Sequence, residues 1–262
     1  ICIKEKIDAI LTFIDPEIEV LAQNREVFES IGVKVLVPEL ETAKLCFDKY
    51  KMYEYLVKNN IKTPKTYNSF ESFNKDYQNN KIVFPVFAKY RTGSGSVGAQ
   101  KINTLEELNT YLKENENEEI IIQEFMAGLD LDADVYVDII SKKPVSIFSK
   151  RKIETKIGGA SKTISFKDPK LFEFIKKIVP LFEFNGPIDM DFFEKDGEYY
   201  LSEINPRFGG AYLHAYGAGV DFIKLIEKNI SNIANEEEIG KYDDDIAMLM
   251  YDSVVIKNMR EL

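Results

Sequence analysis

The sequence has few of the features that mark exported, membrane or disulfide-stabilised proteins. Its two cysteines, Cys2 and Cys46, are too few for a disulfide framework and lack the spacing of metal ligands, which favours buried thiols. No apolar run is long enough to span a membrane, and residues 1–10 carry too many charges for a signal peptide. We therefore expect a cytoplasmic protein with no membrane partner.

Histidine is scarce and a basic surplus is missing. His214 is the only histidine, and no base partner for it is evident, so Ser-His-Asp hydrolysis has no support and a packed or substrate-adjacent ring is expected. The 34 lysines and arginines against 44 aspartates and glutamates give a net charge of −10 at pH 7. Duplex nucleic acid is bound by clustered basic residues, so this charge argues against a nucleic-acid partner. An anionic ligand would need a local basic site.

The chain of 262 residues, 45% of them apolar, can form one large or two smaller domains. A strand, a helix and a strand at 8–13, 16–30 and 33–37 predict a parallel βαβ unit. The sequence opens without methionine, in what resembles the end of an amphipathic helix, so we expect an N-terminal piece to be missing. Further expected elements are a helix at 43–59, a break at 61–64, strands at 83–90, 119–125, 130–140 and 143–151, and helices starting at Asp168 and near Phe222.

Residues 93–98 match the pattern G-x-G-x-x-G, which alone is a weak signal. In a dinucleotide-binding fold this loop opens a helix, whereas here residues 97–102 look extended and the next helix waits for a capping box at Thr104. Walker A, HRD and DFG sequences are absent, and Lys89 precedes the loop instead of following it. A strand, a glycine loop and a second strand favour a flap whose amides close over phosphates. An ordinary surface turn is the alternative.

The most informative stretch is 188–208, in which two alternating segments flank Lys195-Asp196-Gly197 and predict a β-hairpin. A two-residue turn would place Asp191 opposite Ser202 and send Glu203 to the other face. A three-residue turn, with Gly197 in the left-handed position, would place Asp189 opposite Glu203. This second register, which we favour, gathers four oxygen-bearing side chains on one face: Asp189, Asp191, Glu203 and Asn205.

Like charges on one face of a sheet repel, so this arrangement predicts a bound cation. Oxygen ligands without cysteine or histidine suit Mg²⁺ better than Zn²⁺. Arg207 follows the acidic strand and would lie near the metal, with a structural salt bridge to Asp189 or Asp191 as the alternative. Lys89 sits on a mostly apolar strand beside the glycine loop, which favours phosphate contact over a lysine that only extends to solvent.

Together these residues resemble the ATP-grasp superfamily, especially the branch of the carbamoyl-phosphate synthetase large subunit, biotin carboxylase and single-copy carboxylate-amine ligases. The resemblance runs from about Asp8 to Val220, and Glu203-Ile-Asn-Pro-Arg-Phe-Gly-Gly is its most specific part. It implies an α/β and α+β ATP-grasp fold, in which two α+β subdomains, one a mobile lid, clamp ATP behind a partial N-terminal α/β domain. The expected boundaries are 1–42 for the N-terminal remnant and 43–262 for the ATP-grasp domain, with the lid at about 64–124.

The resemblance also implies roles for individual residues. Arg207 would stabilise charge on the transferred phosphoryl group, and Arg151 would face the phosphate or the substrate carboxylate. Asp130 would bind the ribose, although relatives commonly carry the longer glutamate there. ATP phosphates would be contacted by Lys49, Lys89 and the lid loop of Gly93, Ser94, Gly95, Ser96 and Val97; adenine by Gln123, Glu124, Phe125 and Met126; and Mg²⁺ by Asp191, Glu203 and Asn205.

By this resemblance the chain is expected to be an ATP-dependent carboxylate-amine ligase that releases ADP and phosphate. Its partners would be a small carboxylate and an amine, with acceptor specificity in residues 155–162 and 211–219. The synthetase large subunit carries two such units in tandem and this chain has one. Two alternatives stay open, namely phosphorylation of bicarbonate, as in carbamoyl-phosphate synthetases or carboxylases, and a non-catalytic ATP-binding module. A homodimer is left open as the oligomeric state of the chain.

Overall fold

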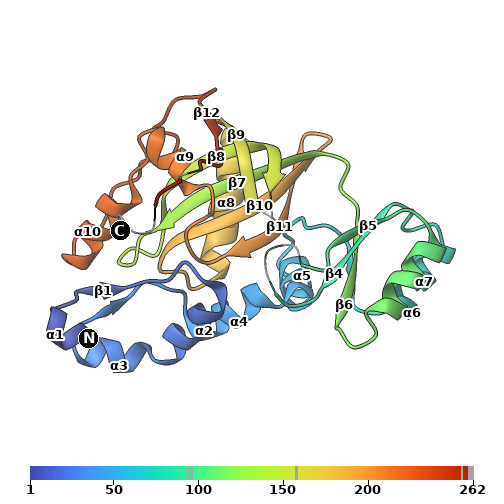
Figure 1. Cartoon of the computed structure of the whole chain (residues 1–262), viewed down its shortest axis with the longest axis horizontal. Coiled ribbons are helices and arrows are strands. Elements are labelled where there is room, and N and C mark those ends of the chain that lie inside the picture. Colours follow the sequence, from blue (N-terminus) through green and yellow to red (C-terminus); the bar gives the residue numbers. More distant parts are fainter. Residues whose placement is uncertain (94, 96, 157–158, 255, 259–262) are drawn as a thin grey trace.

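The computed structural model describes residues 1–262 except 94, 96, 157–158, 255 and 259–262. In the described residues the strands form a two-stranded, a six-stranded and a four-stranded sheet. Figure 1 shows these sheets as an N-terminal unit, a large central sheet and a smaller sheet at the far end. Among the described helices, none combines the length and apolar content that crossing a bilayer requires.

The N-terminal unit contains the predicted parallel strand pair. Its elements are α1 (Cys2–Glu5), β1 (Ala9–Ile10), α2 (Asp15–Gln23), α3 (Arg25–Ser30) and β2 (Lys34–Val35). The strands β1 and β2 pair in parallel, as predicted, but are shorter than expected. The single helix expected at 16–30 is interrupted at Asn24, which divides it into α2 and α3. Of the two cysteines, Cys46 is buried and Cys2 is half-buried.

The helix predicted at 43–59 is also divided, and the division has a physical cause. Asp48 separates α4 (Leu40–Phe47) from α5 (Lys49–Lys58) because its backbone is extended. Its carboxylate accepts hydrogen bonds from the backbone N–H groups of Tyr50 and Lys51, at 3.2 and 3.0 Å, and so caps α5. Arg91 donates to the same carboxylate at 2.9 and 2.7 Å. Lys49 is thereby fixed at the first position of α5.

The smaller sheet, which lies within the segment expected to form a lid, has a hydrophobic core of its own. Its order is β3 (Thr66–Tyr67), β6 (Ile120–Glu124), β4 (Val86–Tyr90) and β5 (Gln100–Ile102), all antiparallel. It is accompanied by α6 (Phe70–Gln78), which was not predicted, and α7 (Leu105–Glu114). Thr104 caps α7, as predicted, by accepting the Glu107 N–H at 3.1 Å. Because side chains alternate along β4, Val86 and Ala88 enter this core, while Phe87 and Lys89 face the large sheet.

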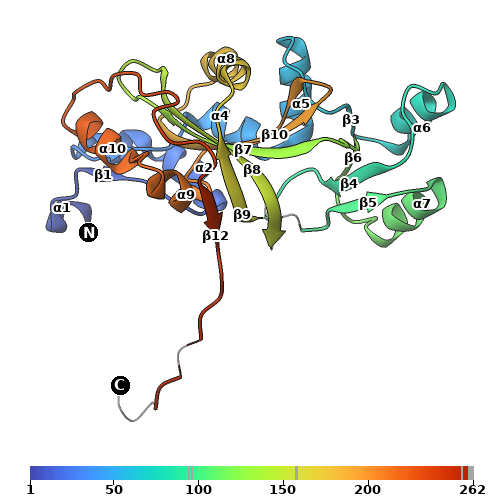
Figure 2. The same ribbon diagram turned by 90° about the horizontal axis from the view of Figure 1, so that it is seen from above.

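The large sheet carries the main core on one face and polar groups on the other. Its order is β11 (Glu198–Asn205), β10 (Gly186–Lys195), β7 (Leu129–Val137), β8 (Pro144–Lys156), β9 (Gly159–Phe166) and β12 (Ala247–Leu249). The capped helix expected at Asp168 is α8 (Pro169–Ile178), which is followed by the short η1 (Val179–Leu181) and packs on the apolar face. The helix α9 (Tyr212–Gly217) lies by the opposite face, and α10 (Phe222–Ile230) follows it (Figure 2). The strands β9 and β12 were not predicted.

The hairpin of β10 and β11 has a two-residue turn, so the favoured three-residue turn is wrong. Asp196 and Gly197 both have positive φ, 54° and 72°, and Lys195 pairs with Glu198. A β-bulge then adds Ser202 as an extra residue, so that Phe192 pairs with Leu201 but Asp191 pairs with Glu203. Asp189 therefore lies opposite Asn205, not Glu203. The four predicted side chains still share one face, because the bulge makes the shift that the turn was expected to make.

Candidate functional site

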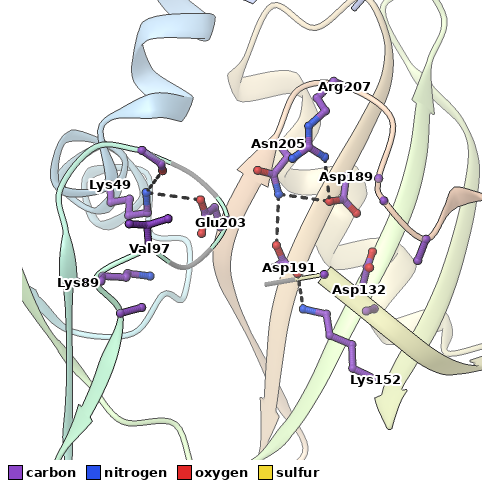
Figure 3. Close-up of a pocket in the computed structure, with 18 of the residues that line it drawn as sticks. Lys49, Lys89, Val97, Asp132, Lys152, Asp189, Asp191, Glu203, Asn205 and Arg207 are labelled. Atoms are coloured by element: carbon purple, nitrogen blue, oxygen red, sulfur yellow. Dashed lines mark hydrogen bonds and ion pairs between the residues drawn. The ribbon is translucent and has the colours of Figure 1, made fainter. Parts of the chain in front are cut away.

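A cavity of about 560 Å³ lies between the smaller sheet and the polar face of the large sheet (Figure 3). This volume is in the range of small-molecule sites. The wall brings together most of the candidate residues for phosphate, metal and catalysis: Lys49, Lys89, Gly93, Gly95, Val97, Asp191, Glu203, Asn205 and Arg207. Ser94 and Ser96 lie outside the described residues. The two sheets thus bring segments from distant parts of the sequence to one site.

Two lysines form the cationic wall of the cavity. The Lys49 ammonium donates to the Gly93 carbonyl at 2.6 Å and lies 3.7 Å from a carboxylate oxygen of Glu203. Lys89 projects into the same space from β4 (Figure 3). Burial and the positive charge of Lys49 lower the pKa of Lys89, against the opposing effect of Glu203 and Asp191. An anion between the two ammonium groups would offset their repulsion and the cost of burying the Lys89 charge. The position therefore suits a phosphate group.

The glycine loop needs glycine at specific positions. Gly93 and Gly95 adopt positive φ, 99° and 70°, which other residues rarely tolerate. At Gly98 a Cβ would lie 2.5 Å from the Tyr90 ring, and Tyr111 donates a hydrogen bond to its carbonyl. In the described part of the loop that joins β4 to β5, Gly93 and Gly95 bring backbone to the cavity wall, as an anion-binding flap requires, and Val97 adds an apolar side chain.

The acidic wall is the hairpin of β10 and β11. Asp191 and Glu203 face each other across the hairpin, and the Asn205 amide donates to Asp189 and Asp191 at 3.2 and 3.3 Å. Burial raises the pKa of Asp191, and the neighbouring charges of Asp132 and Glu203 add to this, while Lys152 opposes it. Crowded carboxylates whose charged form is disfavoured are stabilised by a cation. The donor set of two carboxylates and one carboxamide fits Mg²⁺.

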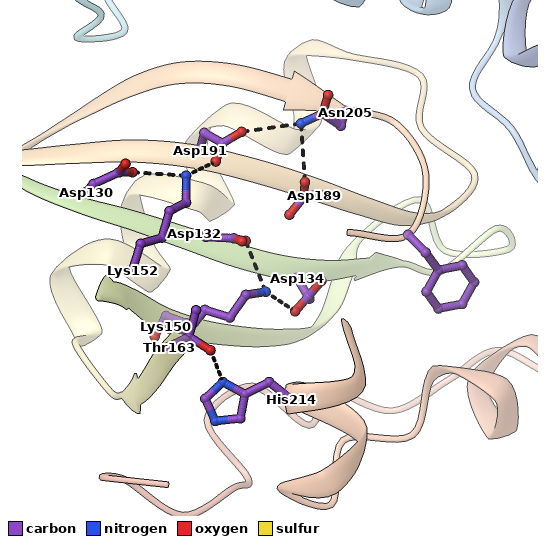
Figure 4. Close-up of polar contacts among 12 residues, drawn as sticks. Asp130, Asp132, Asp134, Lys150, Lys152, Thr163, Asp189, Asp191, Asn205 and His214 are labelled. Carbon is purple, nitrogen blue, oxygen red and sulfur yellow. Dashed lines mark hydrogen bonds and ion pairs between the residues drawn. The ribbon is translucent and has the colours of Figure 1, made fainter. Parts of the chain in front are cut away.

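Two lysines on β8, half-buried Lys152 in the cavity wall and buried Lys150 behind it, contact the acidic residues and were missed by sequence reasoning. Lys152 lies 3.0 Å from Asp130 and forms an ion pair with Asp191. Lys150 is fully buried, 3.1 Å from Asp132 and in contact with Asp134 (Figure 4). Alternation along β8 puts Arg151 on the opposite face, where it is exposed and outside the cavity wall. The expectation that Arg151 faces the phosphate or substrate carboxylate is therefore wrong, and its two neighbours take that side.

Arg207 lines the cavity and is held by the N-terminal unit. Its Nε donates to Asp15 Oδ1 at 2.7 Å and its Nη1 to the Phe208 carbonyl at 2.9 Å. The nearest Asp189 oxygen is 3.7 Å away, so the salt bridge considered as the alternative is the weaker contact. Asp15 begins α2 and is 192 residues from Arg207 in sequence. No local pattern relates two such positions, which is why Asp15 was missed.

The residues expected at adenine and ribose lie outside the cavity wall. Gln123 is committed to a hydrogen bond with Thr66 at 2.9 Å, and Glu124 lies 3.5 Å from Lys195. Both stand at the end of β6, where the smaller sheet passes into β7 of the large one. The cavity wall therefore contains the residues expected at the phosphates and the metal, but not those expected at adenine and ribose. The expected residues absent from its wall are Gln123, Glu124, Phe125, Met126 and Asp130.

His214 is packed, as expected. Its ring is buried against Phe148, and its nitrogens lie 2.7 Å from the Thr163 hydroxyl and 2.9 Å from the Ile246 carbonyl. Both nitrogens are thus engaged by neutral groups, and burial lowers the pKa of the ring. These contacts join α9 to β9 and to the segment before β12.

Comparison with known protein families identifies two segments. Residues 46–211 match the family model of the ATP-grasp domain, which is more than half of the chain, and residues 1–36 match the PylC-like N-terminal domain. Among curated proteins, the chain is 26% identical to a D-alanine–D-alanine ligase of Francisella philomiragia, over 69% of this chain and 63% of that protein. It is 24% identical to a carbamoyl phosphate synthase large chain of Thermoanaerobacter, over 74% and 19% respectively. The chain thus spans less than two thirds of either relative.

Solved structures show the same fold. Biotin carboxylase of Campylobacter jejuni, described as a complex with β,γ-ATP, has a TM-score of 0.75 at 17% identity and covers 90% of this chain. An L-amino acid ligase of Bacillus licheniformis has a TM-score of 0.64 at 18% identity and also covers 90%. This chain covers 57% and 58% of those two chains. At such identities the likeness concerns the fold.

Proposed function

Because this chain belongs to the ATP-grasp family, we propose that it is an ATP-dependent carboxylate-amine ligase. One observation carries the proposal: a cavity with two lysines and a glycine loop on one wall faces Asp191, Glu203 and Arg207 on the other. Cationic groups suit phosphates, and paired carboxylates suit the metal that accompanies them. A site built for phosphoryl transfer needs both, at opposite sides of the transferred group.

In the proposed reaction the substrate carboxylate takes the γ-phosphoryl group of ATP, and an amine then displaces phosphate from the acyl phosphate to form an amide. Bound Mg²⁺ would supply charge neutralisation, held by Asp191, Glu203 and Asn205. Lys49 on α5 and Lys89 on the smaller sheet would bind the phosphates. Arg207 would offset the negative charge that develops on the transferred group. No side chain has to form a covalent bond, so positioning and charge dominate.

We also propose that the smaller sheet closes as a lid, so that the glycine loop excludes water from the acyl phosphate. The Gly93 carbonyl already accepts a hydrogen bond from Lys49, and the same ammonium lies 3.7 Å from Glu203 on the other wall. Acceptor specificity would come from the part of the cavity wall that includes Gly159, Ala160 and Ala211. These small residues leave room for a substrate beside the phosphates, which a module that only binds ATP would not need.

The test is ADP release from MgATP with panels of carboxylic acids and amines. Arg207→Ala is expected to lower turnover on the order of 10³-fold or more, with ATP binding retained. Arg151→Ala is the matched control, because Arg151 lies on the opposite face of the same sheet. Near-normal turnover in Arg207→Ala would refute its role. ADP release stimulated by bicarbonate alone would favour the phosphorylation of bicarbonate, and none with any substrate would favour a non-catalytic ATP-binding module.

A further inference from the structure

The two lysines of the cationic wall belong to parts of the molecule with separate hydrophobic cores. Lys49 begins α5, whose buried side chains Met52 and Leu56 are part of the main core. Lys89 lies on β4, whose alternate side chains enter the core of the smaller sheet. Figures 1 and 2 show α5 between the two sheets. Neither core alone sets the distance between the two ammonium groups.

The two ammonium groups repel each other, so their proximity needs support from other contacts. Burial lowers the pKa of Lys89, and the positive charge of Lys49 lowers it further, because the two charges are close. The Gly93 carbonyl at 2.6 Å and the Glu203 carboxylate at 3.7 Å offset the charge of Lys49. Both are contacts of a long, flexible side chain, and they do not fix the backbone of Lys49 relative to β4.

Arg91 connects the two parts at the base of Lys49. It follows β4 directly, and its backbone N–H donates to the Glu119 carbonyl, at 2.8 Å, where β6 begins. Its carbonyl accepts the Lys49 N–H at 3.0 Å. Its guanidinium donates from Nε and Nη2 to the two carboxylate oxygens of Asp48, at 2.9 and 2.7 Å. Arg91 therefore ties the end of β4 to the first residues of α5.

The contact between Arg91 and Asp48 is a two-point ion pair, the geometry in which arginine binds a carboxylate most firmly. Burial acts to raise the pKa of Asp48, but the hydrogen bond from Arg91 and the other donors lower it below its usual value. The ionised carboxylate also caps α5. It thus fixes Lys49 within α5 through the cap, and α5 against β4 through Arg91. Arg91 itself lies outside the cavity wall, so it acts through the residues that it holds.

We propose that Arg91 is a positioning residue for phosphate binding: by clamping Asp48 it holds Lys49 beside Lys89, so that both ammonium groups act on the phosphates together. The inference rests on the proposed function, in which these two lysines bind the phosphates of ATP. It makes the ion pair of Arg91 and Asp48 the joint between the smaller sheet and the main core. The hydrogen bond from Lys49 to the backbone of Arg91 does not depend on the side chain, so loss of the guanidinium should weaken phosphate binding without abolishing it.

The first test measures MgATP binding by calorimetry for Arg91→Met, both in the unaltered protein and in a Lys49→Met background. In the unaltered protein the dissociation constant should rise about 10-fold, less than the 10²-fold that a displacement of 1 Å can cost at a reacting centre, because the backbone contact remains. In the Lys49→Met background the same substitution should change it less than about twofold, because Arg91 then has no ammonium to position. An equal loss in both backgrounds would assign Arg91 a structural role only and overturn the inference.

Lys49→Met alone separates this inference from the function on which it rests. It should weaken MgATP binding more than Arg91→Met does. Weaker binding in Lys49→Met with unchanged binding in Arg91→Met would overturn the inference and leave the ligase function standing. Unchanged binding in Lys49→Met would contradict the phosphate role of Lys49 and overturn both that assignment and the inference. The absence of MgATP binding in the unaltered protein would overturn the proposed function as well.

The partner residue and a matched control separate positioning from folding, with thermal unfolding measured for each variant. Asp48→Asn loses the charge but keeps a good helix cap, so it should weaken MgATP binding as Arg91→Met does, and the double variant should be no weaker than either. Fully additive losses would contradict the clamp. Lys51→Met is the control, because Lys51 also lies 3.6 Å from the Asp48 carboxylate but its side chain is 64% exposed. Its MgATP affinity should be unchanged, and a loss as large as that of Arg91→Met would overturn the assignment to Arg91.

Discussion

The ion pair of Asp15 and Arg207 provides the sharpest prediction, because it joins the N-terminal unit to the proposed active site. The two side chains are 11% and 17% exposed and meet at 2.7 Å, with a second contact of 3.5 Å. Asp15→Asn removes the negative charge while it keeps the size of the side chain. We expect this substitution to lower both stability and turnover, since the guanidinium would lose its main anchor.

The expected loss of stability follows from the remaining contacts. Removing one member of a buried ion pair typically costs about 3–5 kcal/mol when the other charge is left without compensation. Here Arg207 would keep the Phe208 carbonyl at 2.9 Å and Asp189 at 3.7 Å. We therefore expect about 2 kcal/mol, roughly half of that cost. In a protein of this size each kcal/mol shifts Tm by about 2–4 °C, which predicts a decrease of about 4–8 °C.

A double-mutant cycle isolates the pair from its surroundings. Thermal and urea unfolding are measured for the unaltered protein, Asp15→Asn, Arg207→Gln and the double variant. A coupling energy of about 1–2 kcal/mol is expected, since groups in direct contact are not additive. Turnover of Asp15→Asn should fall about 10–100-fold, less than for Arg207→Ala, because the charge stays but its orientation is lost. Additive effects on stability together with unchanged turnover would refute the reasoning.

Three further predictions concern other parts of the structure. Gly128→Ala should lower the free energy of unfolding by about 3 kcal/mol in urea titrations, because the added Cβ would lie 2.0 Å from the Glu194 carbonyl. Gly217→Ala is the control, and its free energy of unfolding should change little because the space around Gly217 is open. Burial acts to raise the pKa of Asp138, but hydrogen bonds from backbone and asparagine groups lower it to about 2. The ionised Asp138 carboxylate therefore stabilises the fold above about pH 4, and this stabilisation is lost as the pH falls toward 2. Asp138→Asn should lower the free energy of unfolding by about 2–3 kcal/mol at pH 7, and the difference from the unaltered protein should narrow below pH 4. Glu203→Gln should remove the Mg²⁺ dependence of nucleotide binding, and an unchanged Mg²⁺ titration by calorimetry would contradict the metal assignment.

The β10–β11 hairpin shows how far local sequence reasoning reaches. The alternation of acidic and apolar residues indicated which side chains share a face, because side chains in a strand alternate with a period of two. The register could not be derived in the same way. A two-residue turn with a bulge at Ser202 and a three-residue turn at Gly197 place the same four side chains on one face. Nothing in the identity of Ser202 marks it as the extra residue. Bulges depend on how neighbouring strands twist and pack, which is tertiary information.

Contacts between distant segments account for the other omissions. The sequence shows alternating aspartates in β7 and β10 and alternating lysines in β8, but only the pairing of β8 with β7, and of β7 with β10, brings Lys150 to Asp132 and Lys152 to Asp191. The choice of Arg151 failed for a related reason. Three consecutive basic residues do not show which of them faces the aspartates of β7, and the structure puts exposed Arg151 on the opposite face from buried Lys150 and half-buried Lys152. Buried charges need partners, and such partners can be found from sequence only when the register is known.

The distribution of charge explains how an acidic protein can hold an anion. The cavity wall contains cationic Lys49, Lys89, Lys152 and Arg207 and acidic Asp132, Asp189, Asp191 and Glu203. On the large sheet Lys152 is paired with Asp191, and Arg207 is paired with Asp15, so both are already offset. Lys49 and Lys89 lie toward the smaller sheet, where their positive charges are offset less. The carboxylate of Glu203 is 3.7 Å from the Lys49 ammonium. The cavity is thus cationic toward one sheet and acidic toward the other. A ligand that combines phosphates with a divalent metal is attracted by both sides, and bare phosphate by only one. Affinity for the nucleotide should therefore depend on Mg²⁺ more steeply than the net charge of −10 alone would suggest.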